Sequence, residues 1–163
     1  EHGHFHTFLR FAGMPEGIKP QAPKKKRKHG KKKPIGAHLI AIAMDAKGFP
    51  IKLFTVNRWV TNEVWYPAAD VTRMVPRFRI DHAWPSRATN RWLTGIVALF
   101  RPQIYELLKA RDAAVAAWLK RHPRRNAYED RDLEVTSEAP VSIAEQIRTI
   151  EKALGVEPGR DES

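Results

Sequence analysis

The sequence predicts an α+β fold in which a small antiparallel sheet is followed by helices. Residues 37–57 have the pattern of two strands joined by a tight turn, and residues 1–11 alternate in the manner of a third strand. Beyond residue 86, apolar residues recur at helical spacing in three segments. A run of strands before a run of helices is typical of this fold class.

The predicted hairpin at residues 37–57 is the central element. Strict alternation places one set of its first-strand residues on one face and a second set on the other: His38, Ile40, Ile42 and Met44 against Leu39, Ala41 and Ala43. Both faces are largely apolar, as in a strand that is covered on both sides. Asp45 and Gly48 are typical of a tight turn, and residues 49–56 are rich in β-branched and aromatic residues.

The first eleven residues are predicted to pair with this hairpin as a third strand. Extended, the segment projects alternate residues to one face, namely His2, His4, His6 and Phe8. The opposite face carries Phe5, Leu9 and Phe11, and we expect this face to pack on the core.

The rest of the chain is predicted to be mostly helical. Residues 62–66 have the composition of a short further strand, and a helix that begins near residue 68 is limited by Pro76. Longer helices are expected at about 87–100 and 103–121, and a capping box begins another at 143–154.

These elements predict a domain organisation. Residues 1–122 form a single α+β domain, and the charged, weakly patterned segment 123–141 is interpreted as a linker. The C-terminal helix occupies 142–155, and residues 156–163 are expected to be disordered.

The net charge of +11 is concentrated in one short segment. Residues 24–33 contain eight Lys or Arg residues and no acidic residue, so the remainder of the chain has a net charge of +3. The segment is therefore a basic loop insert that can bind nucleic acid or another polyanion through Lys24, Lys25, Lys26, Arg27, Lys28, Lys31, Lys32 and Lys33. The alternative is a solvated loop that confers solubility. Residues 23–28 also resemble a nuclear-localisation signal.

Composition excludes several classes of protein. The chain has no cysteine, which excludes disulfides, thiolate metal ligands and a cysteine nucleophile. No segment approaches the roughly 20 apolar residues of a membrane span, and a cytoplasmic protein is predicted. The first residue is Glu1 rather than Met, so we expect that a native segment can precede it.

The histidines near the N-terminus predict a metal site. On a strand, His4 and His6 share one face about 6.5–7 Å apart, close enough to bind one zinc or iron ion. His2 is an additional candidate ligand, and His38 or His82 is the candidate for completing the site. The alternative is a terminal stretch that binds metal adventitiously, because no HExxH or similar motif is present.

A duplicated Asn-Arg-Trp sequence is the other candidate site. It occurs as Asn57-Arg58-Trp59 and Asn90-Arg91-Trp92. The two arginines can grip a carboxylate or phosphate while the asparagines orient it. The structural alternative, which we favour, is that arginine stacks on tryptophan and asparagine satisfies backbone groups. The local Asp81-His82-Ser86 combination lacks a nucleophile elbow, and Ser86 fits a helix cap better.

Several long motifs together resemble an uncharacterised bacterial protein family labelled as a domain of unknown function. They are EHGHFHTFLR, HLIAIAMD, LFTVNRWVT, DHAWPS and NRWLTGIVALFRP, and they lie within residues 1–14 and 37–120. The basic insert is not part of this resemblance. The resemblance implies no activity, and it implies that family members continue upstream of Glu1.

Two functional hypotheses follow. In the first, a soluble protein binds a divalent metal ion through His4 and His6 and acts on a small anionic substrate near Arg58 and Arg91. In the second, a non-enzymatic nucleic-acid-associated or assembly subunit uses residues 24–33 for nucleic acid and the 143–154 helix for a protein partner.

Overall fold

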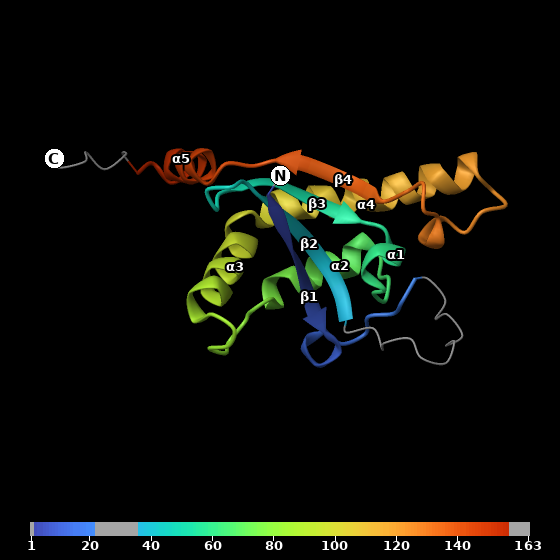
Figure 1. The fold of residues 1–163 in the computed structure, drawn as a ribbon, viewed down its shortest axis with the longest axis horizontal. Helices are drawn as coiled ribbons and strands as arrows, with labels where there is room; N and C mark the ends of the chain where they lie inside the picture. Colours follow the sequence, from blue (N-terminus) through green and yellow to red (C-terminus); the bar gives the residue numbers. More distant parts are fainter. Residues whose placement is uncertain (1, 22–35, 157–163) are drawn as a thin grey trace.

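A computed structural model of the chain describes residues 2–21 and 36–156. Its sheet has four antiparallel strands in the order β1-β2-β3-β4 (Figure 1). The strands are β1 (Gly3–Arg10), β2 (Gly36–Met44), β3 (Pro50–Val56) and β4 (Val135–Pro140). Together with the helices, this sheet confirms the α+β prediction.

The helices predicted near residue 68 and at 87–100, 103–121 and 143–154 are present in that order, and the short α1 is an additional helix that was not predicted. The α-helices are α1 (Arg58–Thr61), α2 (Ala68–Met74), α3 (Arg87–Leu99), α4 (Arg101–Arg121) and α5 (Ile143–Leu154). Short 3₁₀ helices occur at η1 (Phe11–Gly13), η2 (Val75–Arg77) and η3 (Ala127–Glu129). Pro76 lies in η2 and ends α2, as predicted. Within the described residues, none of these helices is both long and apolar enough to cross a membrane.

One face of the sheet packs against α2, α3 and α4, and we call it the helix face (Figure 1). Ile40, Ile42 and Leu53 from the sheet are fully buried there. They join a single core with apolar residues from all three helices, including Val71, Met74, Ile96, Val97, Ile104 and Leu108. This layer of burial is the main apolar contribution to the stability of the fold.

The opposite face carries a different set of side chains, and we call it the histidine face. It presents His4, His6 and Phe8 from β1, His38, Ala41 and Ala43 from β2, and Phe54 from β3. Ala41, Ala43, Phe54 and Val56 form a small buried cluster with Val60 of α1 packed against it.

The central hairpin is confirmed, including its turn. The Asp45 carboxylate accepts hydrogen bonds from the backbone N–H groups of Lys47 and Phe49, both at 2.9 Å. Gly48 has φ 84°, a conformation that glycine adopts without steric cost. Pro50 is the first residue of β3, where its missing N–H does not interrupt the ladder.

A β-bulge in β2 changes the predicted alternation. Thr7 pairs with Ile40, but the next residue, Phe8, pairs with His38, so Leu39 has no partner on β1. The prediction that His38 shares a face with Ile40 is therefore wrong, and His38 lies on the histidine face. The predicted core side of β1 is only partly buried, because Leu9 is buried whereas Phe5 and Phe11 are exposed.

Two further predictions are corrected by the backbone pairing. Residues 62–66 are not a strand, although Val64 N–H donates to the Gly36 carbonyl at 3.1 Å beside β2. The segment 123–141 is not simply a linker, because it contains η3 and β4, and β4 is the edge strand beside β3. The polar composition of β4 concealed it, since an edge strand buries little of its surface.

The start of β2 approaches β1 too closely for any side chain. A Cβ atom at Gly36 would lie 1.9 Å from the Leu9 carbonyl oxygen, which belongs to the backbone and cannot rotate away. Only glycine therefore allows β1 and β2 to pair at this end of the sheet.

We predict that Gly36→Ala destabilises the fold by about 1–3 kcal/mol or more, because the strands must separate to admit the methyl group. Urea unfolding followed by circular dichroism measures this change. Gly3→Ala is the matched control on the same strand pair, since nothing lies within 4 Å of its added Cβ atom. Equal effects of the two substitutions would contradict the argument.

Candidate functional site

The bulge in β2 places His38 next to His6 on the histidine face. The His6 Nδ1 atom lies 3.0 Å from His38 Nε2, within hydrogen-bond distance. The ring of Phe8 packs edge-on against His38, with 5.2 Å between ring centroids. Because alternation alone would have turned His38 toward the helices, the bulge is what forms this pair.

His4 extends the pair into a row of three imidazoles. Its ring lies edge-on to His6 at 4.9 Å, and Phe54 packs against both rings at 5.7 and 6.2 Å. Burial increases along the row, since His4 is exposed, His6 is half-buried and His38 is buried. The row therefore runs from solvent into the sheet.

The surroundings keep the two inner imidazoles neutral. Burial lowers the pKa of His6, and the nearby His4 lowers it further. Burial lowers the pKa of His38 well below its usual value, with smaller effects in the same direction from His6 and Arg111. Neutral imidazole is the form that binds metal ions and accepts protons.

A buried carboxylate lies behind His38. The Glu63 carboxylate accepts a hydrogen bond from the backbone N–H of His38 at 2.7 Å, and Thr61 Oγ1 donates to it at 3.3 Å. Burial raises the pKa of Glu63 to about 7, against the opposing effects of Arg111 and of the hydrogen bond from His38. Glu63 is thus poised to change charge near neutral pH.

Arg111 of α4 is a buried cation, and of the charged groups around Glu63 it lowers the pKa of that carboxylate the most. Its guanidinium stacks on the Trp65 ring at 4.1 Å and donates to the Tyr66 carbonyl at 2.7 Å. It also pairs with Asp112 at 2.8 Å, and Asp112 accepts from the Ala68 N–H. These contacts tie α4 to the segment that carries Glu63.

The other predicted metal ligands lie elsewhere. His2 is exposed, and its backbone N–H donates to the Met44 carbonyl. His82 lies before α3, where its carbonyl accepts from the Asn90 side chain. The described parts of the chain contain no ready-made group of three or more His, Asp or Glu side chains able to hold a metal ion.

The two Asn-Arg-Trp copies are in separate places and make structural contacts. Asn57 donates to the carbonyls of Ala127 and Leu133, and Arg58 is paired with Glu129 at 2.7 Å. In the second copy, Asn90 donates to the carbonyls of His82 and Trp84. Arg91 is exposed on α3 and lines a hollow there. These hydrogen bonds match the structural alternative for both asparagines. The Arg58 guanidinium is also held by structural contacts, but it lies over the ring of Tyr128, at 5.4 Å, and the cation over the Trp59 ring is Arg131.

The remaining predicted sites are only partly described. The basic residues 24–33 lie outside the described residues. The C-terminal helix is present as α5, with the predicted Ser142 cap, and Gln146 hydrogen-bonds to Leu99 and Gln103. Its apolar residues Ile147, Ile150 and Leu154 are exposed, so a partner for α5 stays a prediction.

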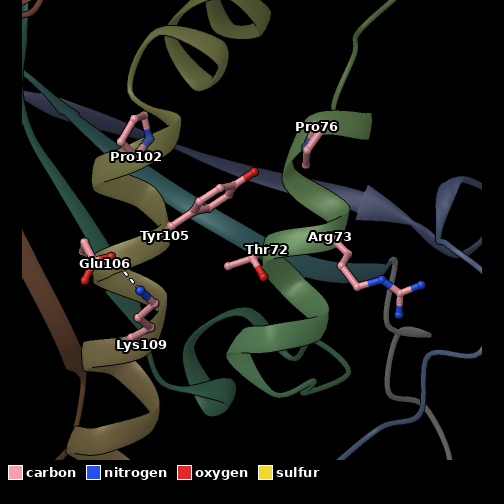
Figure 2. Close-up of a pocket in the computed structure, with 7 residues that line it drawn as sticks. All are labelled: Thr72, Arg73, Pro76, Pro102, Tyr105, Glu106 and Lys109. Atoms are coloured by element: carbon pink, nitrogen blue, oxygen red, sulfur yellow. Dashed lines mark hydrogen bonds and ion pairs between the residues drawn. The ribbon is translucent and has the colours of Figure 1, made fainter.

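A hollow between α2 and α4 is less suited to be a site. Figure 2 shows Tyr105 between the two helices and the Arg73 side chain directed away from α4. Glu106 and Lys109 pair with each other at 2.7 Å. The polar groups of this hollow therefore do not converge on a common point. In most binding sites the polar groups do converge in this way.

Sequence reasoning missed the residues that organise the histidine row. Thr7, Glu63 and Arg111 are polar residues buried within apolar surroundings. In the sequence, the one sign of such a residue is a charged or hydroxyl side chain within an otherwise apolar segment, as Glu63 is within residues 62–66. This sign does not reveal which group the side chain will contact in the fold.

Comparison with known families places the chain. Residues 1–141 match the family model described as Domain of unknown function (DUF6969). The chain belongs to this family. The match confirms the resemblance inferred from the motifs, and it includes β4, which supports counting 135–140 as part of the domain. No curated protein and no solved structure shows significant similarity to the chain.

We predict that Glu63 makes stability fall as pH rises through neutrality. The unfolded chain releases this proton near 4.5 and the folded chain near 7, so between these values the folded state binds more protons. Relative to Glu63→Gln, which does not titrate, the wild type should lose on the order of 3 kcal/mol between pH 4.5 and 8.

Urea unfolding of both proteins at pH 5 and pH 8 measures this difference. Glu16→Gln, at an exposed position, is the matched control and should show no comparable pH dependence. A wild-type stability that rises relative to Glu63→Gln over this range would contradict the prediction.

Proposed function

We propose that this protein binds a divalent transition metal ion, zinc or iron, on the histidine face through His6 and His38. The observation that carries the proposal is the 3.0 Å separation of His6 Nδ1 and His38 Nε2. Two imidazole nitrogens that each lie ~2.0–2.1 Å from one ion are about 2.9–3.4 Å apart for ordinary coordination angles. The separation therefore suits two ligands of one ion, and binding requires each ring to turn its nitrogen lone pair from the other ring toward that ion.

The proposed site has two fixed ligands. His4 is the neighbouring imidazole, and its exposed side chain can turn toward the ion as a third ligand. The other positions are filled by water or by an oxygen of a bound molecule. Since the row opens to solvent at His4, the site has the open coordination of catalytic metal centres rather than the closed set of structural ones.

The electrostatics support binding by neutral imidazoles. Burial lowers the pKa of both His6 and His38, so protons compete weakly with a metal ion near neutral pH. Glu63 accepts from the His38 backbone rather than from its ring, so it fixes the position of His38 without occupying a ring nitrogen. A preorganised ligand position favours binding.

The chemistry open to such a site is metal-assisted hydrolysis or oxidation of a small molecule, in which the ion activates water or a substrate oxygen. The anionic-substrate part of this hypothesis does not include Arg58, because its guanidinium is buried and paired with Glu129.

We predict that untagged wild-type protein retains a stoichiometric metal ion and that His6→Ala abolishes it, because one of two fixed ligands is lost. Elemental analysis after dialysis measures retention, and cobalt substitution followed by visible absorption reports nitrogen coordination. His38→Gln should also abolish binding, and His4→Ala should weaken it.

His82→Ala is the matched control, since His82 is exposed and lies outside the row. It should keep full metal content. Metal-free wild-type protein that also takes up no cobalt would remove the proposal, and so would equal loss of metal in His6→Ala and His82→Ala.

A further inference from the structure

A second hollow lies between α3 and the segment that leads into it. Its volume is about 620 Å³, a size typical of small-molecule sites. The lining residues that matter for its chemistry are Arg79, Asp81, His82, Arg87, Arg91 and Gly95. We call it the arginine hollow. It shares no residue with the histidine row formed by His4, His6 and His38.

Positive charge in the arginine hollow exceeds negative charge. Three arginines line it against one carboxylate, Asp81, which lies 3.4 Å from Arg79. Arg87 and Arg91 are one helical turn apart on the same side of α3, a spacing at which like charges repel. The α3 sequence, Arg87–Leu99, contains no acidic residue that would offset them. A bound anion relieves this repulsion.

Gly95 leaves the floor of the hollow open. It lies one turn beyond Arg91 in the interior of α3, where glycine costs about 1 kcal/mol relative to alanine. No atom lies within 4 Å of an added Cβ atom, so packing does not require glycine here. Because Gly95 lines the hollow, a larger side chain would take up ligand space.

A solvent-exposed tryptophan adjoins the hollow. Trp84 follows Ala83, which lines the hollow, and 80% of its surface is exposed. The Asn90 amide donates to the Trp84 carbonyl at 3.2 Å and to the His82 carbonyl at 2.9 Å, which fixes this segment against α3. Trp84 thus carries an exposed aromatic ring one residue from the lining of an arginine-rich hollow. Aromatic rings and basic side chains together are what proteins use to stack a base and hold its phosphate.

We propose that the arginine hollow binds a nucleoside phosphate, with Arg87 and Arg91 holding the phosphate and Trp84 stacking on the base. The guanidinium forks supply paired N–H donors that match phosphate oxygens. The same chemistry is presented by a free nucleotide and by a nucleotide within a single strand. This binding is independent of the metal site, since neither site contains a residue of the other.

Binding of ATP, tripolyphosphate and a fluorescent single-stranded oligothymidylate to the full chain tests the proposal. Arg87→Gln/Arg91→Gln should weaken ATP or oligonucleotide binding by about tenfold or more. The matched control is Arg10→Gln/Arg148→Gln, which removes the same charge at exposed positions elsewhere and keeps the basic segment. It should change affinity by no more than about threefold. If ATP binds more tightly than the oligothymidylate, the ligand is a free nucleotide; if the oligothymidylate binds more tightly, it is a nucleotide within a single strand.

Two further variants separate the proposal from general charge attraction. Trp84→Ala should weaken the binding of ATP more than the binding of tripolyphosphate, because tripolyphosphate has no base to stack on the ring. Gly95→Leu should weaken the binding of ATP, because the leucine side chain fills the hollow. It should leave the melting temperature of the protein equal or higher, because leucine favours the helix more than glycine does. The proposal is overturned if the two double variants weaken binding equally, if the wild type binds no probe, or if Trp84→Ala affects ATP and tripolyphosphate alike.

Discussion

The β-bulge at Leu39 is the constraint on which the histidine row depends. A bulge leaves backbone groups unpaired, and unpaired buried groups cost on the order of 1–3 kcal/mol each. Here the Thr7 hydroxyl donates to the Ile40 carbonyl at 2.8 Å and accepts from the Ile40 N–H at 3.2 Å. Glu63 accepts from the His38 N–H on the other side of the bulge. With these groups satisfied, β2 can turn His38 to the face opposite Ile40.

Because a buried carboxylate, that of Glu63, accepts the His38 N–H at the bulge, its negative charge must also be compensated. A buried anion is strongly disfavoured unless a cation or hydrogen bonds compensate for lost hydration. Arg111 supplies positive charge from α4, and Trp65 and Asp112 hold that guanidinium in place. The long helix α4 therefore supports the histidine face through the sheet, although it packs on the opposite side. The raised pKa of Glu63 shows that compensation is partial, so its charge state changes near neutral pH.

The sequence predicts the parts of this structure that follow a regular period. The hairpin, the N-terminal strand and the helices after residue 86 repeat at two or 3.6 residues, and they occur where expected. The bulge has no such signal, because Leu39 and Ile40 are both apolar and both buried. Regular alternation on β1 makes His4 and His6 predictable as a pair, whereas His38 comes beside them only through the bulge, which the sequence does not reveal. β4 was missed because its partner β3 lies about 80 residues earlier, and pairing at that distance leaves no local pattern.

β1 connects the two proposed sites while keeping them apart. His4 and His6 point to the histidine face, and Phe5 between them points the other way and meets Trp92 of α3 at 6.1 Å. Arg91, the neighbour of Trp92, lines the arginine hollow. A ligand in the hollow and an ion on the histidine face thus lie on opposite sides of the sheet, and neither can contact the other directly. The Phe5–Trp92 contact joins the strand that carries His4 and His6 to the helix that carries Arg91, and the shared core on the helix face joins the same sheet to α3.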